Sequence, residues 1–118
     1  MIFRIAKDHT EPVLLYQIVD VNGCPIDLTS ITEVEFSLIK QTRCEDIFLD
    51  RAAAEKSSLP NYPASMGWVI YHWSLTDTAV ADYYYGRFHL KDGSNWSAFP
   101  RQLEQLEVYV ERSGDECS

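Results

Sequence analysis

The segment from Gly67 to Gly93, "GWVIYHWSLTDTAVADYYYGRFHLKDG", gathers seven aromatic residues and two histidines within a small chain. Exposed aromatic rings stack on sugars or anchor protein interfaces, and histidines ligate metal ions. The same residue types also fill the cores of β-sheet proteins, where aromatics are enriched in the strands. The segment therefore raises three hypotheses: a sugar-binding surface, a metal site, or two ordinary core strands.

The strands that must carry these side chains divide them into two groups. Residues 67–73 and 83–91 each read as a strand, in which successive side chains point to opposite faces of a sheet. The aromatics predicted to point inward and to fill the core are Tyr71, Trp73, Tyr84 and Phe88. Those predicted to point outward, with two from later strands, are Trp68, Tyr83, Tyr85, Trp96 and Tyr109.

Three of the outward aromatics, Trp96, Tyr83 and Tyr85, form the candidate protein-contact site. Trp96 lies in "NWSAFP", a stretch without charge, and an uncharged strand at the edge of a sheet is open to pairing with another chain. Exposed Trp and Tyr are also enriched at protein interfaces. Two alternatives stay open for the outward rings: stacking on sugars, and packing across strands on a partly solvated face.

Neither a catalytic site nor a metal or cofactor site is predicted. His72 and His89 are expected to point outward from separate strands, which favours two lone exposed histidines over a metal pair. The chain has no nucleophile elbow, no phosphate-binding glycine loop and no metal-binding helix. Acidic neighbours such as Glu33 and Glu35 fall on the solvent face of a strand. We therefore expect a protein that is not an enzyme.

Most of the remaining chain also alternates with a period of two. Residues 13–20, 33–38 and 106–111 read as strands, the Asn-Gly pair at 22–23 and "KDGS" predict tight reversals, and Pro100 ends its strand. The residues predicted to form the core are Tyr16, Ile18, Val34, Phe36, Leu38, Val69, Tyr71, Trp73, Tyr84, Phe88, Leu90, Val108 and Val110.

Four segments lack this regularity. Residues 44–50 favour a short strand, and residues 51–66, with two prolines and an Ala-rich start, favour a long loop with one helical turn. Residues 74–82, "SLTDTAVAD", favour a capped helical turn between strands. The N-terminal stretch around His9 is expected to be flexible.

Short strands separated by turns about every ten residues predict an all-β fold, an immunoglobulin-like antiparallel β-sandwich of about seven strands. A chain of 118 residues with 46% hydrophobic residues matches one domain with a single core. We expect this sandwich domain to span residues 1–112, followed by a flexible C-terminal tail over residues 113–118.

Charge and composition exclude several classes of partner. The formal net charge of −8 opposes binding to a phosphate backbone, so nucleic acid is not an expected partner. No apolar run approaches the ~18 residues that a membrane span needs, and the N-terminus does not read as a secretory signal. Membrane binding is not expected. The three cysteines, Cys24, Cys44 and Cys117, are odd in number and widely spaced, which favours free thiols.

The order of several small motifs carries a family resemblance. "DVNGCPIDLTSITEVEFSL", the strand "GWVIYHW", the turn "TDTA", the strand "YYYGRF", the hairpin "DGS" and the ending "FP" follow one another from about Val13 to Val110. This order resembles the N-terminal immunoglobulin-like domain of the phage baseplate upper protein family and of related small structural proteins of tailed phages. Each motif alone is weak, and their order and spacing carry the resemblance.

The resemblance implies a non-catalytic structural component of a tailed-phage virion, located in its tail, baseplate or neck and made in the cytoplasm of the host bacterium. Such a module would act in assembly, or as an adaptor for fibre or receptor-binding proteins. It would contact other phage structural proteins and occur as a homo-oligomer or in multiple copies within a symmetric particle. A carbohydrate-binding module that uses the exposed Trp and Tyr residues is the alternative.

Overall fold

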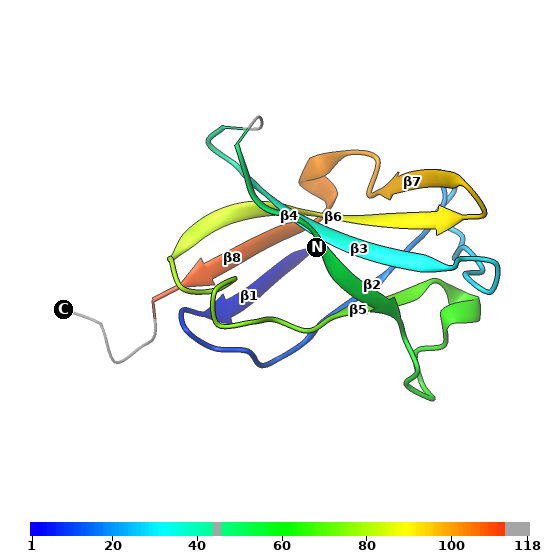
Figure 1. The fold of residues 1–118 in the computed structure, drawn as a ribbon, viewed down its shortest axis with the longest axis horizontal. Coiled ribbons are helices and arrows are strands. Elements are labelled where there is room, and N and C mark those ends of the chain that lie inside the picture. The colour runs from blue at the N-terminus through cyan, green and yellow to red at the C-terminus, as the bar shows by residue number, and fades with distance from the viewer. Residues whose placement is uncertain (44–45, 113–118) are drawn as a thin grey trace.

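A computed structural model describes residues 1–43 and 46–112 of the chain (Figure 1). The described residues form eight β-strands and two short 3₁₀-helices, without an α-helix, which confirms the all-β prediction. The strands are β1 (Ile2–Ala6), β2 (Leu14–Gln17), β3 (Glu33–Lys40), β4 (Ile47–Lys56), β5 (Trp68–Tyr71), β6 (Asp82–Asp92), β7 (Asn95–Phe99) and β8 (Glu107–Glu111). The 3₁₀-helices are η1 (Ala64–Met66) and η2 (Leu103–Gln105). The tail predicted over residues 113–118 lies outside the described residues, as do Cys44 and Cys117.

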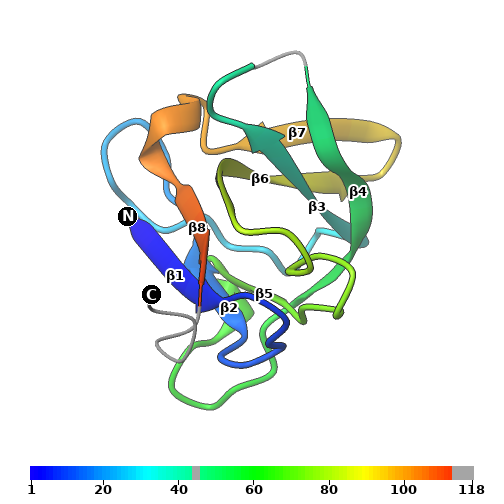
Figure 2. The same cartoon turned by 90° about the vertical axis from the view of Figure 1, so that its left-hand side faces the viewer.

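The eight strands belong to one sheet that curls until it is nearly barrel-shaped (Figure 2). Its order is β1-β8-β6-β3-β4-β5-β2, and β7 pairs with β6 beside this path. Every neighbouring pair is antiparallel except β1 and β8, which run parallel from Ile2 opposite Glu107 to Ala6 opposite Glu111. The two ends of the chain therefore meet in adjacent strands.

The longest strand, β6, organises the sheet. One of its edges pairs with β3, whereas the other edge pairs first with β8 at residues 82–85 and then with β7 at residues 88–92. At Gly86, between these two partners, the backbone N–H donates to the Leu106 carbonyl at 2.9 Å. A Cβ atom at this position would lie 2.9 Å from Leu106 Cδ2. Glycine therefore lets the β7–β8 connection pack directly on β6.

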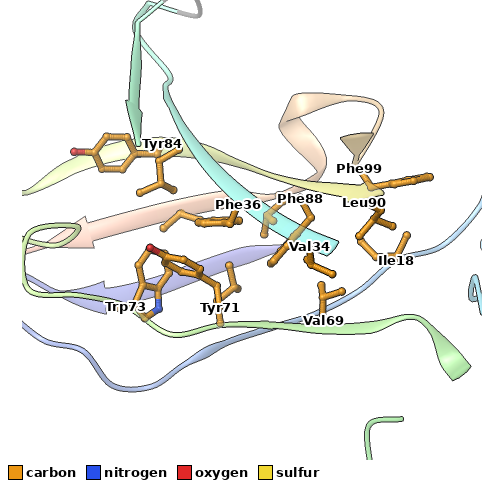
Figure 3. Packing of buried hydrophobic residues seen from close by; sticks show 14 of the residues in the cluster. Ile18, Val34, Phe36, Val69, Tyr71, Trp73, Tyr84, Phe88, Leu90 and Phe99 are labelled. Atoms are coloured by element: carbon orange, nitrogen blue, oxygen red, sulfur yellow. The ribbon is translucent and has the colours of Figure 1, made fainter. Parts of the chain in front are cut away.

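The core is an aromatic cluster centred on Phe36 of β3. Its ring centroid lies 4.7 Å from those of Tyr71 on β5 and Phe88 on β6, and 5.8 Å from that of Trp73 (Figure 3). Twelve of the thirteen residues predicted for the core are buried. The exception is Tyr16, which is half-buried and stacks on Phe88 at the margin of the cluster. Alternation therefore identified the inner face of the sheet.

The connection between β5 and β6 is held by a buried hydrogen bond. Tyr71 Oη donates to Asp77 Oδ2 at 2.6 Å, and the same carboxylate oxygen accepts from the Ser74 N–H at 2.9 Å. Asp77 is only 4% exposed, and burial together with this bond raises the pKa of Tyr71. The helical turn with a Ser or Thr cap predicted for residues 74–82 is found only as one hydrogen-bonded turn. The Asp77 N–H donates to the Ser74 carbonyl at 3.1 Å, and residues 79–80 are bends that do not continue it as a helix.

One strand was not predicted, and another was predicted only in its first part. The N-terminal stretch expected to be flexible begins with β1, which gains its partner β8 from the far end of the chain. Residues 51–56, expected to be loop, continue β4, whose first part overlaps the short strand predicted for residues 44–50. A β-bulge interrupts β4, since Ala52 pairs with Phe36 but Leu49 pairs with Leu38. The bulge breaks the period-two pattern in the sequence.

The predicted turn that follows β2 and the predicted turn that follows β6 are both confirmed. Asn22 and Gly23 lie in a tight turn in which the Gly23 N–H donates to the Asp20 carbonyl at 3.0 Å, and Gly23 has a φ of 81°. Gly93 and Ser94 join β6 to β7, and β7 ends at Phe99, before Pro100. Both Gly23 and Gly93 have a positive φ, a backbone conformation that glycine adopts without steric cost, which explains why glycine occupies the two positions.

Replacing each of two buried tyrosines by phenylalanine should give opposite results. Tyr71→Phe leaves the buried Asp77 carboxylate without its strongest donor, so we expect a loss of about 1.5–3 kcal/mol of unfolding free energy. Tyr84 is also fully buried, but its hydroxyl has no hydrogen-bond partner among the described residues, and burial raises its pKa to about 12. Tyr84→Phe should therefore change stability by less than about 0.5 kcal/mol or increase it. Urea denaturation checks both; equal losses would contradict the assignment.

Gly67 and Gly23 provide a second matched pair. Both have positive φ, of 90° and 81°, so alanine is strained at either position. A Cβ at Gly67 would also collide with the Ile18 carbonyl oxygen, whereas a Cβ at Gly23 meets no atom within 4 Å. We expect Gly67→Ala to lose about 1–3 kcal/mol more than Gly23→Ala in thermal or urea unfolding. Similar losses for the two variants would show that β2 and β5 do not approach as closely as described.

Candidate contact surface

The candidate contact residues Trp96, Tyr83 and Tyr85 lie on the outer face of the sheet. Tyr83 and Tyr85 alternate with the buried Tyr84 on β6, and Trp96 of β7 pairs with Lys91, which shares their face. Tyr83 is 53% exposed and Trp96 is 41% exposed, whereas Tyr85 is half-buried. Lys91 lies six positions after Tyr85 on β6, about 20 Å away at the rise of a strand. The three residues therefore share one face but do not form one compact patch.

At one end of this face, two cations contact the Trp96 ring. The Arg51 guanidinium carbon lies 4.3 Å from the ring centroid, and Lys91 Nζ lies 5.8 Å from it. Arg51 Nε also donates to Glu35 Oε1 at 2.7 Å, and Lys91 Nζ pairs with Glu33 at 3.0 Å. Because Arg51 covers one face of the indole, Trp96 does not offer both faces of its ring to a ligand.

The β4 bulge positions Arg51 over this end of the sheet. Arg51 has a φ of 54°, and its backbone N–H donates to Ser37 Oγ at 3.0 Å. Ser37 Oγ lies 3.0 Å from His89 Nε2, so three neighbouring strands meet at one hydroxyl. A serine beside a histidine is the beginning of a nucleophilic site, but Ser37 is only 4% exposed. The hydroxyl therefore ties β3, β4 and β6 together.

His89 differs from its prediction, because it is half-buried rather than exposed. Its ring lies beside Ser37, at the end of the face that carries Trp96 and Arg51. Burial lowers the pKa of His89, and the neighbouring Arg51 and Arg87 cations lower it further, against the opposing effect of Glu35 and Asp50. These surroundings therefore favour the neutral form of His89. His72 is exposed as predicted and lies 2.9 Å from Glu55 Oε1.

The other end of the face is a smaller cluster around Tyr83. The Tyr83 ring meets Tyr109 of β8 edge to face, with 4.8 Å between centroids, and the Arg4 guanidinium lies 5.0 Å from the Tyr109 ring. Arg4 Nη1 also donates to Glu111 Oε2 at 2.6 Å, and Tyr109 Oη donates to Glu107 Oε1 at 3.2 Å. This cluster joins the first and last strands to β6 and leaves Tyr83 the most exposed ring.

Arg51 is the main residue of this surface that the sequence analysis missed. Residues 51–66 were expected to be loop, so no face of a strand was assigned to Arg51. The signal that could have revealed it is the charged pair Asp50-Arg51 inside an otherwise apolar stretch, which is typical of a β-bulge.

The cavities of the described residues are small or open. One of about 230 Å³ lies between the end of β2 and the β7–β8 connection, lined by Tyr16, Val19, Asp20, Phe99 and Arg101 among others, which is below the roughly 300 Å³ at which small-molecule sites commonly begin. Two more open hollows, of about 450 and 420 Å³, lie beside Glu33 and Glu55 and beside Tyr83 and Glu111. Across residues 1–43 and 46–112, no group of three or more His, Cys, Asp or Glu residues could hold a metal ion. The same residues include no helix that is both long and apolar enough to cross a membrane.

Comparison with known proteins matches the chain to no family model and, at a significant level, to no curated protein.

The environment of His89 predicts a pH dependence of stability. Its pKa is lowered in the folded state, so the unfolded chain takes up the proton more readily as the pH falls through about 6.5. The stability that neutral His89 provides is therefore present above pH 6.5 and decreases below it. We expect the free energy of unfolding of His89→Gln to vary less with pH than that of the unmodified protein, between about pH 7.5 and about pH 5.5. Parallel profiles for the two proteins, or an NMR titration of His89 at or above its ordinary value, would contradict this.

Proposed function

We propose that this protein is a non-catalytic structural module of a tailed-phage virion, acting in assembly or as an adaptor for fibre or receptor-binding proteins. The proposal includes an immunoglobulin-like sandwich fold. The observation that supports it best is where the motifs of the family resemblance lie in the structure: each one falls on a tight turn or on a buried anchor of the fold.

Three of these motifs illustrate the point. In the "PIDLTS" connection, Asp27 Oδ1 accepts from the Thr29 N–H at 3.0 Å, and Leu28 is fully buried. In the "TDTA" turn, Asp77 is the buried acceptor of Tyr71. In "DGS", Gly93 has a φ of 63° and closes the β6–β7 hairpin. The residues that carry the resemblance are therefore those that determine the path of the chain, which supports a shared fold.

The order of the strands also supports the sandwich. Strands β1, β8, β6, β3 and the first part of β4 form one layer, and β5, β2 and the end of β4 form a second. The end of β4 contributes only Glu55 and Lys56 to the second layer, paired with Ile70 and Val69. The layers face each other across Phe36 and Tyr71. Two facing layers that are antiparallel, apart from the β1–β8 pair, resemble the arrangement of immunoglobulin-like domains.

The character of the surface favours a protein contact over catalysis or sugar binding. Among the described residues, Arg51 pairs with Glu35 and Lys91 with Glu33 on the outer face, and the open hollow beside them, which Glu33, Glu35, Glu55 and Lys56 help to line, contains no histidine or cysteine. The exposed rings of Tyr83 and Trp96 lie at opposite ends of the face, whereas a sugar-binding site groups its rings on one open surface. Aromatic and arginine side chains are the residues enriched at interfaces.

Mass spectrometry of purified virions, from the phage whose genome encodes the chain, tests the proposal. We expect the chain in the particle in multiple copies per virion, and a reconstruction should place its density in the tail, baseplate or neck. Tyr83→Ser and Trp96→Ser should reduce incorporation, while Val21→Ser, which alters an equally apolar and 86% exposed side chain elsewhere, should not. Absence of the chain from purified particles would overturn the proposal.

A glycan array separates the carbohydrate-binding alternative from the assembly role. The purified chain should bind no glycan above background. Specific binding that Trp96→Ala abolishes, while Tyr62→Ala at a distant exposed ring leaves it intact, would replace the assembly role with sugar recognition.

A further inference from the structure

The strand β7 is an open edge of the sheet. One edge pairs with β6, from Phe99 opposite Phe88 to Asn95 opposite Asp92, and no described strand pairs with the other edge (Figure 1). Its sequence, NWSAF, has no charged residue and no proline. Edge strands of monomeric proteins usually carry a charge, a proline or a bulge that prevents pairing with another chain. β7 has none of these protections.

The hairpin register determines which backbone groups of β7 are unpaired. Only Gly93 and Ser94 separate Asp92 from Asn95, so these two flanking residues exchange both backbone hydrogen bonds. The same pattern repeats at every second pair, which directs the N–H and C=O groups of Ser97 and Phe99 toward β6. Those of Trp96 and Ala98 therefore point away from β6, toward the open edge.

We propose that β7 pairs with β7 of a second copy of this chain, antiparallel and about a twofold axis at Ser97. In this register Trp96 of one copy lies opposite Ala98 of the other, and the two symmetric pairs form about four backbone hydrogen bonds. The inference rests on the proposed role in protein assembly and assigns that role a specific interface. The two sheets become one continuous sheet, with their outer faces on the same side.

The side chains fit this register. Directly opposed residues lie on the same face, so each Trp96 faces the small Ala98 of the partner and not a second large ring. Arg51 holds the indole over its own sheet, with 4.3 Å between guanidinium carbon and ring centroid, which leaves the edge unobstructed. Ser97 faces its own symmetry mate, and both side chains are small and uncharged.

Charge does not oppose the register. Residues 100–102 form a bend after Phe99, and Gly93 and Ser94 form the turn before Asn95, so the pairing covers only Asn95 to Phe99 of each copy. None of these five residues is charged. The register therefore places no like charges opposite each other.

Other open edges are less suited to pairing. The open edge of β4 is distorted by the bulge at Asp50 and Arg51, and β1 carries Arg4 and is followed by Lys7. β2 is uncharged, but all four of its residues are buried or half-buried, whereas Asn95, Trp96 and Ser97 of β7 are exposed. These features leave β7 as the edge that a second copy can extend.

A cysteine cross-link tests the register directly. In a background in which Cys24, Cys44 and Cys117 are replaced by serine, Ser97→Cys places two thiols opposite each other at a pair whose Cα atoms lie about 4.5 Å apart. Mild oxidation should convert most of this variant to a covalent dimer. In the control variant, Asn95→Cys, the two thiols are offset by four residues, about 13 Å, and should not cross-link. Equal cross-linking of the two variants would overturn the register.

Sedimentation velocity of the otherwise unmodified chain tests the dimer itself. The net charge of −8 on each copy opposes association, so the measurement is made in about 0.5 M salt, which screens this repulsion. We expect a concentration-dependent dimer, and Ala98→Pro should abolish it, because proline removes an N–H that faces the open edge and leaves the β6 ladder intact. Circular dichroism establishes that the variant is folded. A monomer at every concentration up to about 1 mM would overturn the interface. In that case the chain could still be found in virions, so the two proposals can fail separately.

Discussion

The contact between the rings of Phe36 and Tyr71, with 4.7 Å between their centroids, joins the two parts of the sheet. Backbone pairing alone would hold them weakly, since only Glu55 and Lys56 of β4 pair with β5. The cluster of Phe36, Tyr71, Trp73 and Phe88 supplies the missing attachment, because large rings bury much apolar surface and also attract one another. The curvature of the sheet follows from this contact.

The outer face is ordered by a different means. Its side chains are polar or aromatic, and they are held by ion pairs, cation–π contacts and the Ser37 hydroxyl. Exposed ion pairs contribute little to stability, so this network does not account for the fold. Its effect is to hold long side chains in one arrangement. A surface with fixed side chains loses less entropy when it binds, which suits a contact between preformed modules.

Alternation in the sequence was enough to predict the strands with regular pairing and the inner face of the sheet, because each such strand has one buried face. It predicted only the first part of β4, because the bulge at Arg51 shifts the phase and Ala52 to Ala54 carry no contrast between faces. It did not predict β1, whose partner lies about a hundred residues away in the sequence. The outward aromatics were assigned to the correct face, but Tyr83 and Trp96 are separated by nearly the whole length of β6, a distance that depends on strand pairing and is invisible in the sequence.

The parallel pair of β1 and β8 also has a mechanical consequence. The chain enters this pair at Ile2 and leaves it at Glu111, so a pull on the two ends would slide the strands past each other along their length. All the hydrogen bonds between the five residue pairs, together with that from the Lys7 N–H to the Glu111 carbonyl, would then be loaded at once rather than opened one after another. Tension applied through the termini meets the stiffest direction of the sheet, which is the loading that a link between two moving bodies must withstand.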